Sequence, residues 1–439
     1  MTNDTSTKPD TDPAAAALPD RDATAEAAFQ AEQAPRGALS GVRVLDMSRV
    51  VAGPLAAQIL ADLGADVIKV ERPEGEDLRT LGPPWVTSPM TGAEQSTYFQ
   101  TVNRGKRSLT IDFAKPEGAE IVRRLAGESD VVIENFRTGT LAKYGLGYEA
   151  LSTINPGLIY CSITGFGQHG PYSERSAYDY LVQAMGGQMS ITGYADDAAG
   201  AGPMRVAIPI ADISAGNNAA IAILAALQSR SRDGKGQHLD IALLDSQVAI
   251  LLNSLSSWLN TRTKLPKTGN DHQTAVPNGV YHVADGFMLI STFNDREFAR
   301  LAGALGHPEW AEDARFARSR NRLTNRDELR TRMAEVLIAH DRAHWMERLN
   351  QAKVSCGPIN DMADLEHDPQ LLARGMFLTM NHPVMGDIRI VGSPLKLSRT
   401  PVRYERPPPL PGEHTLEILS DVLELSQQDI DDLKQANLF

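Results

Sequence analysis

Residues Gly41 to Arg72, GVRVLDMSRVVAGPLAAQILADLGADVIKVER, decide the fold because they encode a strand, a helix and a second strand. Apolar residues at 42–46 and 66–70 predict two buried strands, and those of 54–63 recur at helical spacing. Pro54 stands in the first helical turn, where its missing N–H costs nothing. Such a unit predicts a parallel sheet and a helix N-terminus that faces a cleft, where free N–H groups suit an anionic ligand.

The alternation of strands and helices continues to about residue 228. Further strands are predicted at 108–112, 130–134 and 158–164, and further helices at 116–126, 138–144 and 214–228. The segment 237–243 is typical of another strand, and the apolar segment 244–259 is typical of a long helix. This pattern predicts an α/β fold with a large, doubly wound, Rossmann-like domain.

The second half of the chain changes character after residue 261. Residues 279–293 alternate like a hairpin, 295–350 are charged and helical, and a last helix is predicted at 413–424. We therefore expect a smaller α+β domain inserted into a large domain that both chain ends build. The expected segments are a disordered acidic tail (1–36), the first part of the large domain (37–230), a linker strand and helix (231–265), the small domain (266–378), and a return linker with the C-terminal part of the large domain (379–439).

Composition restricts the partners of the chain. Its net charge of −12 over 439 residues argues against nucleic acid or an anionic membrane as a partner. No apolar run reaches about eighteen residues, so no membrane span is expected. The first 36 residues fit neither a transit peptide nor a secretory signal, and we expect a cytoplasmic protein. Cys161 and Cys356 lack metal-type spacing, which predicts reduced thiols and no metal site.

The segment from Gly165 to Gly170, GFGQHG, matches the glycine spacing of a dinucleotide-binding loop after a predicted strand. That kind of site requires a helix immediately afterwards, whereas Pro171 begins a stretch without a helical pattern. We interpret these glycines as tight turns and exclude a dinucleotide site.

Asp212 stands between an apolar run that ends at Ala211 and a helix rich in small residues. The local pattern favours a helix N-cap, because aspartate accepts backbone N–H groups at that position. A nucleophile is the alternative, since catalytic residues of α/β folds lie where the cleft opens. The residues by themselves leave both interpretations open.

Long blocks of the sequence resemble family III CoA-transferases, the group that includes carnitine and formyl-CoA transferases. The blocks are VLDMSRVVAGPLAAQILADLGADVIKVERPEGEDLR from Val44, NRGKRSLTIDF from Asn103, DVVIENFRTGTLAKYGLGYE from Asp130, YCSITGFGQHGPY from Tyr160, VSCGPINDMADLEHDPQ from Val354 and LPGEHTLEIL from Leu410. The resemblance runs from about Leu39 to the C-terminus. It implies the fold described above, an interlocked homodimer, and Asp212 as the catalytic nucleophile.

The implied reaction moves CoA between two carboxylic acids. The aspartate attacks the donor thioester to give a mixed anhydride, and the CoA thiolate then converts the anhydride into an aspartyl-CoA thioester. CoA thioesters are thus substrates, and no permanently bound cofactor is expected. Two alternatives remain: an acyl-CoA racemase of the same fold, and a non-catalytic CoA-binding protein. Racemases carry histidine where Tyr178 stands, and tyrosine is a poor base at neutral pH, so Tyr178 favours the transferase.

The family pattern also implies where the substrates bind. The CoA-binding residues that it implies are Val51, Ala52, Arg72, Ile111, Asn135, Phe136, Lys143 and Asp179. The loop TGNDHQTAVPNG, Thr268 to Gly279, resembles that of succinyl-CoA-using members, which implies succinyl-CoA as the donor and a small dicarboxylic acid as the acceptor. A second carboxylate needs a cation or hydrogen-bond donors, and the candidates by sequence position are Arg49, Arg205 and His272.

Overall fold

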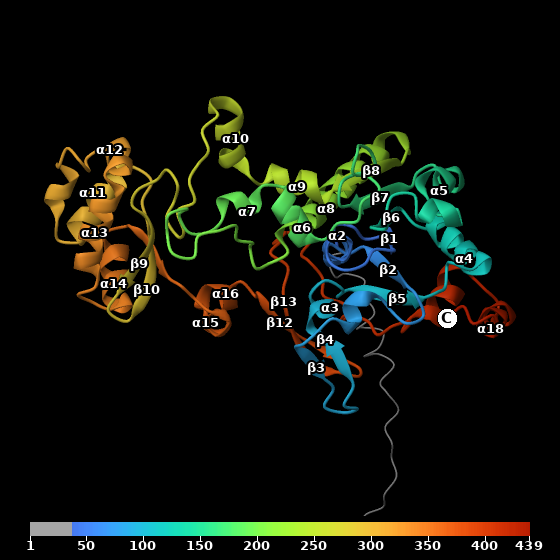
Figure 1. The fold of residues 1–439 in the computed structure, drawn as a ribbon. Helices are drawn as coiled ribbons and strands as arrows, with labels where there is room; N and C mark the ends of the chain where they lie inside the picture. Colours follow the sequence, from blue (N-terminus) through green and yellow to red (C-terminus); the bar gives the residue numbers. More distant parts are fainter. Residues whose placement is uncertain (1–36) are drawn as a thin grey trace, which may run out of the picture.

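The computed structural model describes residues 37–439, and the tail expected at 1–36 lies outside the described residues. Six parallel strands form the central sheet in the order β5-β2-β1-β6-β7-β8 (Figure 1). They are β1 (Arg43–Asp46), β2 (Asp66–Glu71), β5 (Lys106–Thr110), β6 (Val131–Glu134), β7 (Ile159–Thr164) and β8 (Gln237–Ala242). Strand order reverses between β1 and β6, as in doubly wound folds, and this switch point opens a cleft at the carboxyl ends of the strands.

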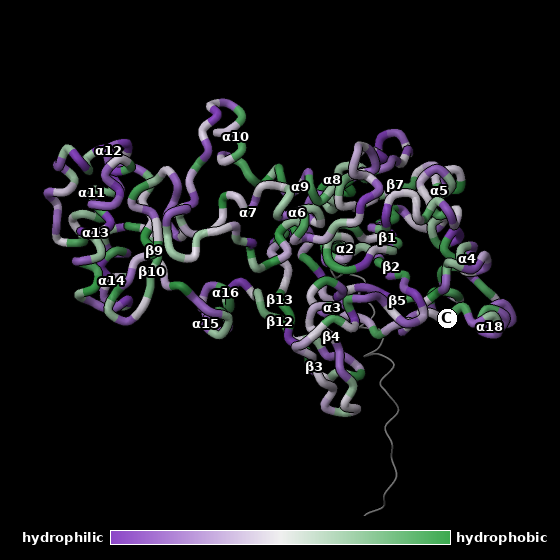
Figure 2. The backbone as a smooth tube through the Cα atoms, in the orientation of Figure 1, coloured by the Kyte–Doolittle hydropathy of each residue, from purple (hydrophilic) through white to green (hydrophobic). Residues whose placement is uncertain are grey.

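Helices cover both faces of this sheet. One face carries α2 (Ala52–Asp62), α6 (Asp179–Met185), α8 (Ile210–Asp233) and α9 (Leu243–Ala249), and the other carries α4 (Pro116–Gly127), α5 (Tyr148–Ile154), α17 (Thr415–Glu417), η4 (Ile418–Val422) and α18 (Gln427–Gln435). The predicted first helix is confirmed. Figure 2 shows that it is more hydrophobic than α18. The C-terminal segment therefore packs on the sheet that the N-terminal half builds.

Among residues 37–439, one helix is long and apolar enough to cross a membrane by length and composition, namely α8. Ala215 and Ala219 of this helix are fully buried in the core cluster that also holds α2. The packing against α2 and the sheet explains the apolar composition of α8.

A second body has its own core and lies apart from the central sheet (Figure 1, left). Its antiparallel sheet consists of β9 (Asn278–Val283), β10 (Gly286–Ser291) and β11 (Ser355–Pro358), and the hairpin predicted at 279–293 is confirmed. The helices that accompany it are α11 (Asp295–Ala304), η3 (Pro308–Ala311), α12 (Ser319–Thr324), α13 (Arg326–Leu337) and α14 (Arg342–Gln351).

Shorter elements fill the remaining chain. They are η1 (Asp77–Thr80), β3 (Trp85–Thr87), β4 (Glu94–Ser96), α3 (Thr97–Thr101), η2 (Leu141–Tyr144), α7 (Gln188–Ile191), α10 (Leu252–Thr261), α15 (Met362–His367), α16 (Pro369–Ala373), β12 (Phe377–His382) and β13 (Gly386–Val391). The β12–β13 hairpin has a small core of its own against β3. The domain boundaries proposed from the sequence stay a prediction.

Two predictions of helices were wrong. The helix predicted at 138–144 is only the short turn η2, because left-handed glycines stand at Gly139 and Gly145. The long helix predicted at 244–259 is two helices, α9 and α10, which separate where Leu252 adopts a positive φ of 42°. The strand predicted at 237–243 is confirmed as β8, which pairs with β7 and completes the sheet.

Candidate active site

A cavity opens at the carboxyl ends of β6 and β7, beside the beginning of α2 and the first turn of α8. Asp212 lies in its wall. The other residues of its lining that the sequence singled out are Arg49, Val51, Ala52, Asn135, Phe136 and Tyr178. The structure thus brings half of the expected CoA-binding positions into one cavity with the expected nucleophile.

Two glycines allow α2 to begin so close to Asp212. A Cβ at Gly216, one turn after Asp212, would lie 2.7 Å from the carbonyl oxygen of Ala52. A Cβ at Gly53 would lie 2.2 Å from the side chain of Ser48. Because Gly216 lacks a side chain, the first turns of α2 and α8 approach each other, and because Gly53 lacks one, Ser48 packs against the start of α2. Val51 and Ala52 thus line the same cavity as Asp212.

Asp212 is not the N-cap of its helix, contrary to the local sequence pattern. The helix α8 begins at Ile210, so Asp212 already belongs to its first turn, and Pro209 takes the cap position. Asp179 supplies the missing acceptor: its Oδ2 accepts the N–H groups of Ala211 at 2.7 Å and of Asp212 at 3.3 Å. Among residues 37–439, no hydrogen bond occupies the Asp212 carboxylate, which leaves it free to react.

The surroundings of Asp212 make it a basic carboxylate. Burial, and secondarily the charge of Asp179, raises its pKa from 3.8 to about 7. Tyr98 of α3 lies close enough to be affected in turn, because burial and then the charge of Asp212 raise the pKa of its phenol. A carboxylate with a pKa near neutrality is more nucleophilic than an ordinary one while a substantial fraction stays ionised at neutral pH.

Asn135 holds the chain on the other side of the cavity. Its Oδ1 accepts the N–H of Arg49 at 2.8 Å, and its Nδ2 donates to the Arg49 carbonyl at 2.6 Å. The Arg49 guanidinium lies 5.1 Å from the ring centroid of Phe136 and pairs with Asp77 at 3.1 Å. Arg72 pairs with the same carboxylate at 2.6 Å, so Asp77 in the cavity wall links Arg49 to Arg72, which lies outside the lining.

Several expected residues lie elsewhere. Ile111 is fully buried in the core and offers no surface to a ligand, while Lys143 is exposed on η2. The Asp179 carboxylate is occupied as the cap of α8 and by Gln183, and its contact with CoA stays a prediction. Arg205 stacks on Tyr180, at 4.2 Å from the ring centroid, outside the cavity lining.

His272 also lies apart from Asp212. It stands in the second body, where its Nδ1 accepts the N–H groups of Thr274 and Ala275 at 3.1 and 3.0 Å. Through these hydrogen bonds the His272 side chain stabilises the loop to which it belongs.

Sequence reasoning missed Arg175, Arg137 and Tyr98. Arg175 lines the cavity in the loop that follows the glycine turns, and its guanidinium lies 4.7 Å from the ring centroid of Tyr172. No acidic side chain of the described residues forms an ion pair with it. The only sign of it in the sequence was its position, between the glycine loop and Tyr178.

Comparison with known proteins agrees with this geometry. The sequence model of CoA-transferase family III matches residues 39–415. A succinate–glutarate CoA-transferase of Agrobacterium fabrum is 44% identical over 88% of this chain and 95% of its own length. A succinyl-CoA:glutarate CoA-transferase of Mus musculus is 39% identical over 90% of this chain and 88% of its own length.

A solved structure has the same fold. The crystal structure of a CAIB/BAIF family protein from Brucella suis superposes with a TM-score of 0.78 at 42% identity. The superposition covers 88% of this chain and all of that protein. The chain therefore belongs to CoA-transferase family III and is a CoA-transferase, because the family model, these relatives and the shared fold all agree.

Proposed function

We propose that the protein transfers CoA from succinyl-CoA to a small dicarboxylic acid, with glutarate as the preferred acceptor, through an aspartyl-CoA thioester on Asp212. The names of the relatives at 44% and 39% identity support these substrates. The observation that carries the proposal is the Asp212 carboxylate, which lies without a hydrogen-bond partner among the described residues in the cavity that α2 borders.

The reaction needs no external proton or cofactor. An Asp212 oxygen attacks the thioester carbon of succinyl-CoA, the C–S bond breaks, and a succinyl-aspartyl anhydride and CoA thiolate result. The thiolate attacks the aspartyl carbon, which releases succinate and leaves aspartyl-CoA. A glutarate carboxylate then displaces the thiolate, and the thiolate attacks the glutaryl carbon, which yields glutaryl-CoA and restores Asp212.

Residues around the cavity have distinct roles in these steps. The amides of Val51 and Ala52 at the start of α2 are the donors that would stabilise each oxyanion. Arg175 is the cation that would bind the second carboxylate of the acid, because Arg49 is already paired with Asp77. Burial of the anhydride within the cavity limits its hydrolysis.

The rate of the first half-reaction should depend on pH. Since the pKa of Asp212 is about 7, roughly a tenth of the enzyme is ionised at about pH 6 and roughly nine tenths at about pH 8. We expect kcat/KM for succinyl-CoA to rise about tenfold over that interval, as measured by CoA release in single-turnover experiments.

A neighbouring acid requires a control. Burial also raises the pKa of Glu134 to about 7, and this carboxylate accepts the Phe136 N–H at 2.9 Å. In the variant Glu134→Gln the inflection near pH 7 should persist. Its disappearance in that variant would assign the titration to Glu134 and not to the nucleophile.

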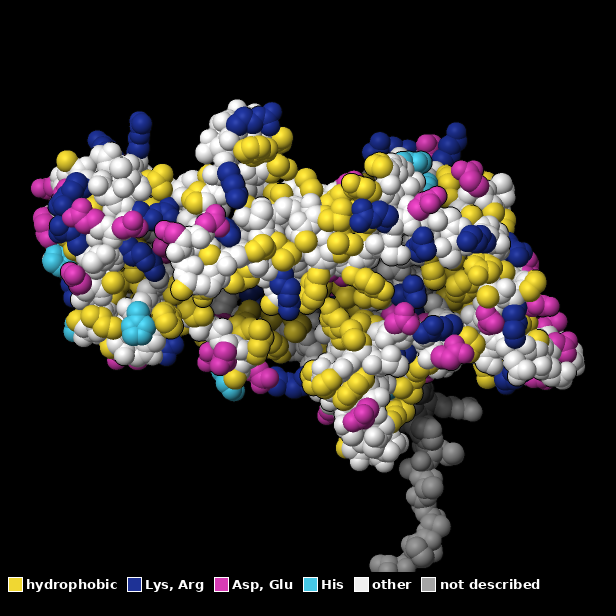
Figure 3. All heavy atoms as spheres, viewed as in Figure 1, with side chains coloured by type: hydrophobic (Ala, Val, Ile, Leu, Met, Phe, Trp, Pro, Cys, Tyr) yellow, Lys and Arg dark blue, Asp and Glu magenta, His cyan; other side chains and the backbone are white. Residues whose placement is uncertain are grey.

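We further propose that the protein is a homodimer. No residue of α10 is buried within its own chain. Its apolar side chains are exposed too: Leu252, Trp258 and Leu259 are 74, 47 and 59% exposed. Figure 3 shows hydrophobic side chains on this protruding helix, and apolar patches of this kind mark contact surfaces.

Light scattering tests the dimer. The wild type should have twice the chain mass of 47.6 kDa, and the double variant Leu252→Asp, Leu259→Asp should shift toward monomer. Ile154→Asp on α5, where the wild-type residue is 51% exposed, is the matched control and should stay dimeric. A monomeric wild type at micromolar concentration would contradict the proposal.

A further inference from the structure

Val50 adopts a backbone conformation that its side chain disfavours. Its φ is +66°, in the left-handed region, immediately before α2. A β-branched residue there is a genuine outlier, because Cβ crowds the following carbonyl group. Such strain persists only where the surrounding structure enforces it, and it concentrates at functional sites.

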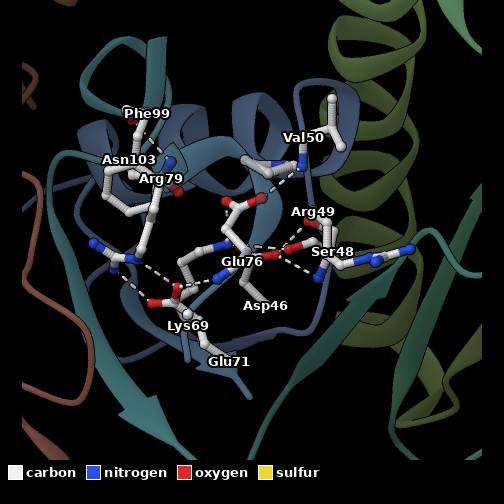
Figure 4. A network of polar contacts seen from close by, with 12 residues as sticks. Asp46, Ser48, Arg49, Val50, Lys69, Glu71, Glu76, Arg79, Phe99 and Asn103 are labelled. Atoms are coloured by element: carbon white, nitrogen blue, oxygen red, sulfur yellow. Dashed lines mark hydrogen bonds and ion pairs between the residues drawn. The ribbon is translucent and has the colours of Figure 1, made fainter. Parts of the chain in front are cut away.

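Side chains from distant segments supply the enforcement, as Figure 4 shows. We call residues Ser48 to Val51 the Val50 turn. The Val50 N–H donates to Glu76 Oε2 at 2.9 Å, and the Ser48 carbonyl accepts from Lys69 Nζ at 3.0 Å. Asn135 binds both backbone groups of Arg49. Side chains from other segments therefore bind backbone groups of Ser48, Arg49 and Val50.

Glu76 and Lys69 form one unit beneath the turn. Lys69 Nζ lies 3.1 Å from Glu76 Oε1, and the two side chains are 0 and 2% exposed. Lys69 comes from β2 and Glu76 from the loop before η1, so the pair ties the turn to the sheet. Neither residue lines the cavity, although Arg49, Val50, Val51 and Ala52 all do.

We propose that Glu76 and Lys69 are positioning residues of the transfer reaction. They hold Val50 in its left-handed conformation and thereby fix the amides of Val51 and Ala52, two residues that line the same cavity as Asp212. This inference rests on the proposed function. A displacement of reacting groups by about 1 Å can cost on the order of a hundredfold in rate, so a turn held in this way has a direct catalytic consequence.

A rescue experiment separates positioning from general stability. Glu76→Ala should lower kcat at least tenfold per folded enzyme while KM for succinyl-CoA changes less than threefold. Adding Val50→Gly should recover at least a third of the lost activity, because glycine adopts positive φ without steric cost. Glu76→Gln retains an acceptor for the Val50 N–H and should lose less than Glu76→Ala.

The matched control is Asp62→Asn at the opposite end of α2. Asp62 pairs with Arg104 at 2.6 Å, and both side chains are nearly as buried as those of Glu76 and Lys69. This variant should lower the melting temperature, keep kcat, and gain nothing from Val50→Gly. A full kcat in Glu76→Ala, an equal loss in Asp62→Asn, or no rescue by Val50→Gly would overturn the proposal.

Hydrogen exchange gives a readout that is independent of activity. Amides of the segment 48–53 should exchange at least tenfold faster in Glu76→Ala than in the wild type, and Asp62→Asn should leave them unchanged. If the wild type transfers no CoA, the proposed function fails. The hydrogen-exchange measurement still decides in that case whether Glu76 holds the turn. Should Glu76→Ala not fold, the comparison of Glu76→Gln with and without Val50→Gly decides, and unchanged exchange in both overturns the proposal.

Discussion

Replacing Asp212 with alanine should lower CoA transfer by roughly 10⁴-fold or more, because the variant lacks the only group that attacks the thioester in the proposed mechanism. Binding of CoA should change less than threefold, since the Asp212 side chain makes no hydrogen bond within residues 37–439 and its N–H group, which donates to Asp179, is kept in the variant. Steady-state assays with succinyl-CoA and glutarate give the first quantity, and calorimetric titration with CoA gives the second. A variant that retains a tenth of the activity would exclude Asp212 as the nucleophile.

The variant Asp212→Asn carries a second expectation, which concerns stability. The folded-state pKa of Asp212 is raised to about 7, so ionisation opposes folding. Its contribution to the free energy of unfolding is present below about pH 4 and is lost as pH rises through about 7. At about pH 8 the asparagine variant should therefore unfold at a higher denaturant concentration than the wild type, whereas at about pH 4 the two should be nearly equal.

The second large effect concerns the choice of acid. The wild type should use glutarate at least roughly tenfold better than valerate, an acid of equal length with one carboxylate, because one charge-assisted hydrogen bond is worth about 1.5–3 kcal/mol. In Arg175→Met this preference should fall to less than about threefold, mainly through loss of glutarate activity. The measured quantity is kcat/KM for each acid at saturating succinyl-CoA.

Arg205→Met is the matched control for Arg175. Arg205 is also a loop arginine that stacks on a tyrosine ring, yet it lies outside the lining of the cavity. Its replacement should leave the preference for glutarate intact. A preference that survives in Arg175→Met and disappears in Arg205→Met would move the acid site to the other arginine, and equal use of both acids by the wild type would exclude a dicarboxylate site.

The sequence predicted the sheet well because its signals are local. Short segments with strand-like composition between helical patterns identified the six strands of the central sheet, which are β1, β2, β5, β6, β7 and β8. The short strands β3 and β4 were not predicted. The break between α9 and α10 was not visible in the same way, since Leu252 and its neighbours are as apolar as a continuous helix would require. There the path of the chain away from the main body overrides local propensity.

The site was predictable only as far as short motifs extend. Val51, Ala52, Asn135 and Phe136 follow strands whose carboxyl ends meet, so their convergence follows from topology. The cap on α8 comes from Asp179, more than thirty residues earlier, and no local pattern encodes such a contact.

Conversely, Arg205 stood close before Asp212 in sequence but points to Tyr180, while the loop arginine Arg175 reaches the cavity. Proximity along the chain was the wrong guide here, because the direction of a loop side chain depends on tertiary contacts.

Trapping the covalent intermediate tests the central claim most directly. Wild-type enzyme should be incubated with succinyl-CoA without an acceptor acid, treated with hydroxylamine, digested and analysed by mass spectrometry. The account predicts a hydroxamate on Asp212, at a stoichiometry that approaches one per active chain, and its absence in Asp212→Asn. A modification at another residue, or transfer that proceeds without any modified Asp212, would contradict the account.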